Sequence, residues 1–218
     1  MRKILVILLL SLSINSIIAQ DAPAFWNEIV AYKKMDSAQP PPKNAILFVG
    51  SSSFRMWKDV ADYFPGYTII NRGVGGSSLP DIVRYSYDII LPYQPKQVVV
   101  YCGDNDMASG KVKADEVLLR FQTLYGIIRQ NLPDTYIHFV AMKPSPSRSN
   151  VMAEVAKGNE QIKAFLEKEK RAGFIDVYHA MLGADGKPKK EIFLEDDLHM
   201  NAAGYAIWQK IMLPYLVK

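Results

Sequence analysis

The sequence predicts an α/β fold, a three-layer α/β/α sandwich built around a five-stranded parallel sheet. Five short apolar runs alternate with segments that have helical spacing, which is the chain order expected of a parallel sheet. Most of the runs are continuously apolar, as expected of strands that are covered on both faces. The strands are therefore expected at residues 45–49, 67–70, 97–102, 135–141 and 174–177.

The segments between these runs have the residue patterns of helices. In residues 114–131, for example, apolar side chains recur every three or four positions, which is the spacing of one helix face. Right-handed crossovers would place the loops after the strands at one edge of the sheet, where ligands bind in open sheets. Helices are expected at residues 24–35, 54–63, 79–91, 114–131, 151–171 and 201–216.

Residues 1–19 have the pattern of a secretory signal peptide. Arg2 and Lys3 precede an apolar stretch, and Ala19 offers a small residue at a cleavage point. The alternative is a retained membrane anchor, but polar residues shorten the apolar stretch below the roughly 20 residues of a spanning helix. We therefore expect a secreted or periplasmic protein with no stable membrane span after cleavage. The expected parts are the signal peptide (1–19), an N-terminal helix with a Pro-rich linker (20–44) and one globular domain (45–218).

The composition excludes several classes of partner. The formal net charge is +4, and removing Arg2 and Lys3 leaves about +2, which gives no case for nucleic-acid binding. Cys102 is the only cysteine, so no internal disulfide can form, and we expect it to lie in the core. The spacings typical of zinc sites are missing from the sequence, so we expect neither a metal nor another cofactor.

Three serines follow the first predicted strand directly. Gly50 permits a sharp turn, and Ser51, Ser52 and Ser53 then lie where the next helix begins. The free N–H groups at a helix start favour negative charge nearby. These serines could therefore serve as a nucleophile, or they could simply cap the helix.

Two further loops carry groups that could stabilise an oxyanion. In the Gly-rich loop at residues 71–78, a close backbone approach at Gly76 could aim an N–H at developing negative charge. The loop lacks the Gly-Lys-Ser/Thr ending of a phosphate-binding loop, and a plain tight turn is the alternative. After the third strand, Asn105 offers a neutral NH₂ donor, although turn formation is the usual role of asparagine there.

Asp196 and His199 give the strongest local signal in the chain. Side chains three apart on one helical turn are neighbours, so we expect the carboxylate to hold one ring nitrogen and to leave the other as a general base. A surface turn with a chance histidine is the alternative reading. His138 and His179 are expected to be structural.

Taken together, these segments resemble the SGNH hydrolases, also called GDSL-type esterases and lipases. The first block of that family, Gly-Asp-Ser, corresponds to Gly50-Ser51-Ser52, and the third, Gly-x-Asn-Asp, to residues 103–106. The last block, Asp-x-x-His, falls on Asp196 and His199. The branch most similar to the chain is that of the platelet-activating-factor acetylhydrolase-like esterases. Ser51 stands where the family has Asp, which puts the local turn and the substrate preference in question.

The resemblance implies a flavodoxin-like SGNH hydrolase domain and a mechanism. Ser52 would be the nucleophile of a Ser-His-Asp triad with His199 and Asp196. Ser52, Gly76 and Asn105 would form the oxyanion hole, and an acyl-enzyme would follow. Ser53 is the alternative nucleophile if the alignment is shifted by one residue.

The substrate implied by the resemblance is a carboxylic ester. Short-acyl (acetyl) esters of carbohydrates and lysophospholipid-type lipids both fit. The residues expected to contact it are Trp57, Met107 and Arg148. Two alternatives remain: a non-catalytic glycan- or lipid-binding module on the same fold, and a flavodoxin-like cofactor protein, which the loop after the first strand disfavours.

Overall fold

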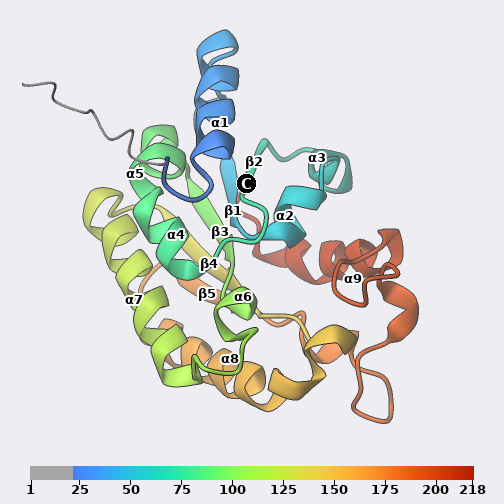
Figure 1. Ribbon diagram of the computed structural model, residues 1–218. Coiled ribbons are helices and arrows are strands. Elements are labelled where there is room, and N and C mark those ends of the chain that lie inside the picture. The colour runs from blue at the N-terminus through green and yellow to red at the C-terminus, as the bar shows by residue number, and fades with distance from the viewer. Residues whose placement is uncertain (1–21) are drawn as a thin grey trace, which may run out of the picture.

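The computed structural model describes residues 22–218 (Figure 1). The predicted signal peptide at residues 1–19 lies outside the described residues. The first described helix is α1, Trp26–Ala38, and a Pro-rich segment connects it to the sheet. Within the described residues, no helix combines the length and the apolar character needed to cross a membrane.

The sheet has five parallel strands, as the sequence predicts. They lie in the order β2-β1-β3-β4-β5. The chain leaves β1 toward one edge to form β2 and then crosses back to β3 on the other side of β1. The switch point between β1 and β3 is where open α/β sheets bind ligands. The strands are β1 Ile46–Gly50, β2 Ile69–Gly73, β3 Gln97–Tyr101, β4 Tyr136–Val140 and β5 Ala172–Ile175.

Helices cover both faces of the sheet (Figure 1). One layer contains α4 Leu79–Arg84, α5 Ser86–Ile89, α7 Ala114–Asn131 and α8 Met152–Leu166, whereas the other contains α2 Ser52–Met56, α3 Val60–Tyr63 and α9 Ala202–Met212. The short helix α6, Asp104–Met107, follows β3. Short 3-10 turns occur at Leu91–Tyr93, Pro146–Val151, His179–Met181, Lys190–Ile192 and Leu213–Tyr215.

Gly50 makes the close contact between β1 and β3 possible. It pairs with Tyr101 in the parallel register and has a φ of 141°. A Cβ atom at this position would lie 1.8 Å from the carbonyl oxygen of Tyr101, a distance that no side chain can occupy. Glycine therefore lets the chain turn directly from β1 into the serine segment.

An aromatic cluster joins α2 to α9 across one face of the sheet. The ring of Trp57 stacks on Tyr205 with centroids 4.7 Å apart, and Phe54 meets Trp208 edge-on at 6.0 Å. Such aromatic pairs add to the apolar area that they bury. The cluster fixes the C-terminal helix against the segment that follows β1.

Several element boundaries differ from the sequence prediction. The helix expected at 79–91 is the two helices α4 and α5, because the backbone leaves the helical region at Tyr85 (φ −97°, ψ 9°). The expected helix 54–63 is two helices, because the backbone leaves the helical region at Trp57 (φ −80°, ψ 69°). The helix expected at 151–171 ends at Leu166, and β5 begins at Ala172 rather than at 174. Val177 lies two residues past the end of β5 and is fully buried, and this buried apolar residue extended the predicted strand beyond Ile175.

Candidate active site

Ser52 is the first residue of α2 and the only one of the three serines that is not buried. Ser51 and Ser53 are 0% and 1% exposed, and their hydroxyls have no hydrogen-bond partner among the described residues. The Oγ atom of Ser52 lies 2.9 Å from Nε2 of His199. A hydroxyl at this distance from an imidazole nitrogen can transfer its proton to the ring.

His199 is held by Asp196 on the side of the ring that faces away from Ser52. The Nδ1 atom of His199 lies 2.5 Å from Oδ2 of Asp196. The other carboxylate oxygen, Oδ1, accepts the backbone N–H groups of Leu198 and His199 at 3.0 and 2.9 Å. The carboxylate therefore fixes both the ring and the backbone next to it.

The segment that carries this pair is a turn, which corrects the predicted helical geometry. Asp197 has a positive φ of 55°, and Leu194 N–H donates to the carbonyl of His199 at 2.7 Å. An aspartate that accepts N–H groups two and three positions ahead forms an Asx-type turn. The two side chains meet because of this turn and not because they share a helix face.

The charge state of Asp196 follows from its hydrogen bonds. Desolvation alone would raise the pKa of this carboxyl, but the hydrogen bonds from the His199 side chain and from the two backbone N–H groups outweigh it. The pKa is lowered to about 2. Asp196 is therefore ionised at neutral pH and can stabilise a positive charge on His199.

The Gly-rich loop after β2 lies directly beside the end of β1. Val74 N–H donates to the carbonyl of Gly50 at 2.7 Å, and the Ser77 hydroxyl donates to Val74 O at 3.0 Å. Gly76 adopts a positive φ of 78°, and its N–H donates to no protein group within residues 22–218. These contacts bring Gly76 to the same end of the sheet as Ser52.

Asn105 joins this loop from the other side of β1. Its Nδ2 donates to the carbonyl of Ser77 at 3.0 Å, and its Oδ1 accepts from Nη2 of Arg148 at 3.3 Å. Because Oδ1 is occupied by Arg148, the NH₂ group of Asn105 is directed toward the Gly-rich loop. The Ser77 carbonyl occupies one N–H of this NH₂ group, and the second N–H donates to no other protein group among residues 22–218.

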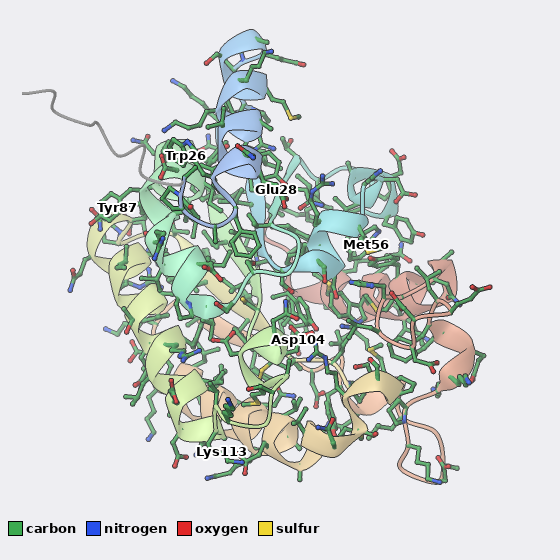
Figure 2. The ribbon with its side chains drawn as sticks, viewed as in Figure 1. Trp26, Glu28, Met56, Tyr87, Asp104 and Lys113 are labelled. Carbon is green, nitrogen blue, oxygen red and sulfur yellow. The ribbon has the colours of Figure 1, made fainter. Side chains whose placement is uncertain are left out.

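A buried polar cluster lies beneath Asn105, and sequence reasoning missed it. Lys143 is 2% exposed, and its Nζ donates to the Tyr101 hydroxyl at 3.1 Å and to Oδ2 of Asp104 at 3.4 Å. Burial lowers the pKa of Lys143, whereas Asp104 opposes that shift. The only indication of this cluster in the sequence is one lysine, Lys143, directly after the apolar run that contains β4. Asp104 lies at the start of α6, at the end of the sheet (Figure 2).

The predicted substrate contacts divide into two groups. Trp57 and Met107 are 1% and 0% exposed, so both belong to the core, which corrects the prediction. The indole of Trp57 is enclosed by the aromatic cluster, and the methyl group of Met107 faces Gly158. Arg148, in contrast, lies beside Asn105 at the site itself.

The described part of the chain contains no group of three or more His, Cys, Asp and Glu side chains placed to hold a metal ion. Asp106 accepts the N–H of Leu79 at 3.0 Å and pairs with Arg120 at 2.6 Å.

The chain is similar to known proteins in sequence and in fold. A sequence model described as the GDSL-like lipase/acylhydrolase family matches residues 46–207. No curated protein matches the chain.

Solved structures share the fold at low sequence identity. A Streptococcus pneumonia protein that carries the description "platelet activating factor" superposes with a TM-score of 0.77 at 20% identity, covering 88% of this chain and 92% of that one. A GDSL-like lipase from Bacteroides thetaiotaomicron gives 0.75 at 19% identity, covering 88% and 97%. A carbohydrate esterase family 3 protein from Talaromyces cellulolyticus gives 0.60 at 15%, covering 78% and 95%. At these identities the likeness shows the fold.

Proposed function

The chain belongs to the GDSL-like lipase/acylhydrolase family and is an ester-bond hydrolase, and from this premise we propose that it is a serine esterase acting through Ser52, His199 and Asp196. The single observation that carries the proposal is the 2.9 Å approach of Ser52 Oγ to His199 Nε2. The 2.5 Å contact of Asp196 with the opposite ring nitrogen supports it.

In the proposed mechanism, Ser52 Oγ attacks the ester carbonyl carbon while its proton passes to His199 Nε2. The N–H groups of Ser52 and Gly76 and the Asn105 amide would stabilise the oxyanion of the tetrahedral intermediate. The intermediate then expels the alcohol, which takes the proton from His199, and leaves an acyl group on Ser52. Water attacks this acyl-enzyme with His199 as the base, which releases the acid and restores the serine.

We propose that the substrate is an ester with a short acyl group, such as an acetylated carbohydrate, or a lysophospholipid-type lipid. The fold shared with a carbohydrate esterase and with a protein described by platelet activating factor supports both classes. Arg148 would lie beside the reacting carbonyl, since it contacts the oxyanion donor Asn105.

A panel of esters tests the proposal. It should contain short- and long-acyl esters, acetylated xylan and a lysophospholipid, each measured with wild type and Ser52→Ala. Ser53→Ala is a matched control, because its hydroxyl is buried and has no partner among the described residues. We expect Ser52→Ala to abolish turnover and Ser53→Ala to retain it. Equal activity in wild type and Ser52→Ala would refute the assignment of the nucleophile.

The second candidate, a non-catalytic glycan- or lipid-binding module, rests on Ser51 standing where the family has Asp. An organophosphonate ester probe separates the two functions. Stoichiometric labelling of Ser52 supports the esterase, whereas folded protein that binds acetylated xylan but is never labelled supports the binding module.

We also propose that the protein is exported to the periplasm or the exterior of the cell. The predicted cleavage after Ala19 would give a mature chain that begins at Gln20. Intact-mass analysis of protein secreted by the expressing cell tests this, because a retained N-terminus would contradict cleavage.

A further inference from the structure

Helix α1 precedes the family-matched residues 46–207, and nothing in the proposed mechanism uses it. Three of its polar side chains, Glu28, Tyr32 and Asp36, follow each other at intervals of four residues and therefore lie on one face of the helix. All three contact the end of β2 or the loop that follows it.

The contacts follow the chain of β2 and its loop in order. Asp36 pairs with the guanidinium of Arg72 and accepts the hydroxyl of Tyr93. The Tyr32 hydroxyl donates to the carbonyl of Gly73. Oε2 of Glu28 accepts the N–H of Gly75 at 3.3 Å. Helix α1 thus contacts the chain from Arg72 in β2 to Gly75, the residue directly before Gly76.

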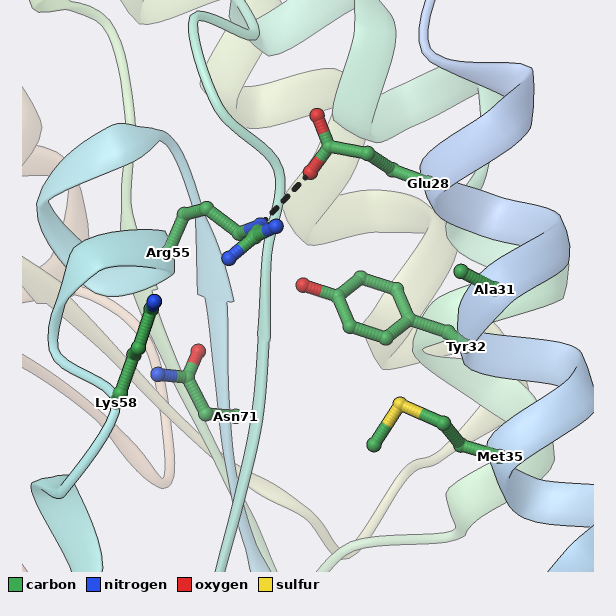
Figure 3. A pocket seen from close by; sticks show the side chains of 7 residues that line it. All are labelled: Glu28, Ala31, Tyr32, Met35, Arg55, Lys58 and Asn71. Carbon is green, nitrogen blue, oxygen red and sulfur yellow. Dashed lines mark hydrogen bonds and ion pairs between the residues drawn. The ribbon is translucent and has the colours of Figure 1, made fainter.

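Glu28 makes a second contact that reaches α2. The same Oε2 atom accepts from Nε of Arg55 at 3.1 Å (Figure 3). Arg55 lies three residues after Ser52 in α2, and Gly75 directly precedes Gly76. One carboxylate oxygen therefore binds both elements that carry the backbone donors of the proposed oxyanion hole.

The Glu28–Arg55 contact lies at the edge of a cavity. This cavity of about 270 Å³ separates α1 from α2 next to the contact, with Tyr32 and Met35 on one wall and Lys58 on the other (Figure 3). Side chains do not fill the space between α1 and α2 here, and the contact between Glu28 and Arg55 connects the two helices beside it. Gly75 lies next to both side chains. A Cβ atom at this position would be in ordinary van der Waals contact with them, 3.7 Å from Glu28 Oε1 and 3.8 Å from Arg55 Cγ.

We propose that Glu28 is a positioning residue that sets the distance between the Ser52 and Gly76 N–H groups. This inference rests on the proposed esterase function of the same site. Glu28 touches no reacting atom and acts through Gly75 and Arg55. Its neighbours on the same helix face, Tyr32 and Asp36, keep the preceding residues of the loop in place.

The Glu28–Arg55 ion pair is partly exposed, and this exposure distinguishes a positioning role from a role in folding stability. The side chains of Arg55 and Glu28 are 46% and 32% exposed, and ion pairs this exposed contribute little to folding stability. Oxyanion stabilisation, in contrast, is sensitive to small displacements, and a shift of about 1 Å can cost on the order of 100-fold in rate. Removal of Glu28 should therefore lower turnover much more than it lowers stability.

The test compares Glu28→Ala with Glu28→Gln and with the control Lys33→Ala. Lys33 lies on the same helix as Glu28, forms an exposed ion pair with Asp88 of α5 and does not contact the loop. We expect Glu28→Ala to lower kcat about tenfold or more at nearly unchanged KM, with a melting temperature within about 3 °C of wild type. Glu28→Gln keeps an acceptor for Gly75 N–H and should recover most of kcat. Lys33→Ala should match wild type.

Hydrogen exchange gives a readout that does not depend on turnover. Glu28→Ala should speed amide exchange in a peptide covering residues 73–77, while exchange in α7 stays unchanged. Wild-type kcat together with wild-type exchange in Glu28→Ala would overturn the inference, even if Ser52→Ala confirms the esterase. If the wild type cleaves no ester, the proposed function fails, and the exchange result alone decides whether Glu28 orders the loop.

Discussion

Ser52 and His199 approach within 2.9 Å of each other although 147 positions separate them in the chain. The contact depends on how α9 is packed, because His199 lies in the turn that leads into this helix. The hydroxyl of Tyr205 in α9 donates to the carbonyl of Ser53 in α2 at 2.9 Å, and Trp208 contacts Phe54. The core on this face of the sheet therefore determines the geometry of the proposed proton transfer.

Replacing the proposed oxyanion donor should reduce turnover without unfolding the protein. Asn105→Ala removes the NH₂ group, and loss of one such donor typically costs roughly 100- to 1,000-fold in kcat. Steady-state kinetics on a short-acyl ester measures the effect, and circular dichroism confirms that the variant is folded. A variant that keeps wild-type turnover would remove Asn105 from the mechanism.

Arg148 should act through the orientation of the Asn105 amide. Its Nη2 donates to Oδ1 of Asn105 at 3.3 Å, so Arg148→Ala frees the amide to rotate. Loss of one charge-assisted hydrogen bond should cost about 1.5 kcal/mol, or about tenfold in kcat/KM. The double variant with Asn105→Ala should lose little more than Asn105→Ala alone. Fully additive losses would instead mean that Arg148 acts independently, for example on the substrate.

Removing the buried lysine beneath the site should destabilise the fold. Lys143→Met leaves the carboxylate of Asp104 buried without its cation, and breaking a buried pair in this way typically costs about 3–5 kcal/mol. Urea denaturation of the variant measures the change. Adding Asp104→Asn should restore part of the stability, because it removes the uncompensated charge. Unchanged stability in the single variant would contradict a stabilising role of the Lys143–Asp104 pair.

His138 should make stability depend on pH below neutrality. Burial lowers its pKa from 6.5 to about 4, and its Nδ1 faces the amide Nε2 of Gln97 at 3.0 Å, an arrangement that suits a neutral ring. The unfolded chain then binds the proton first, so stability is fully present above pH 6.5 and is lost as pH falls toward 4. The shift corresponds to about 3 kcal/mol.

The measurement compares the free energy of unfolding of wild type and His138→Gln across this pH window. Carboxylates titrate in both proteins, so the difference isolates the histidine. We expect the wild type to lose about 3 kcal/mol more than the variant between pH 6.5 and pH 4. Parallel curves would contradict a buried, neutral His138.

Much of the fold could be predicted because strand and helix periods are local. The helix expected at 114–131 has these bounds in the structure, and all five strands occur where apolar runs predict them, with shifted ends. The break at Trp57 could not be predicted in this way. It depends on how the indole packs against Tyr205, a residue almost 150 positions away.

The site shows the same limit. The pattern Asp-x-x-His occurs twice, since Asp176 also holds His179, with a distance of 2.7 Å between Oδ2 and Nδ1. The His179 side chain is 67% exposed, whereas the His199 ring reaches Ser52. The local spacing is sufficient to form both Asp–His pairs. Only the packing of distant elements brings a serine, Ser52, next to one of the two histidines. The burial of Trp57, Met107 and Lys143 likewise depends on tertiary contacts that no local pattern contains.

The single thiol of this protein offers a practical advantage for spectroscopy. Cys102 is fully buried, and burial raises the pKa of its thiol well above the usual value, which makes it a poor nucleophile. Maleimide dyes should therefore leave the native protein unlabelled. A cysteine introduced at exposed Ser147, next to Arg148, would then accept a fluorophore at one defined place, from which ligand entry could be followed in real time.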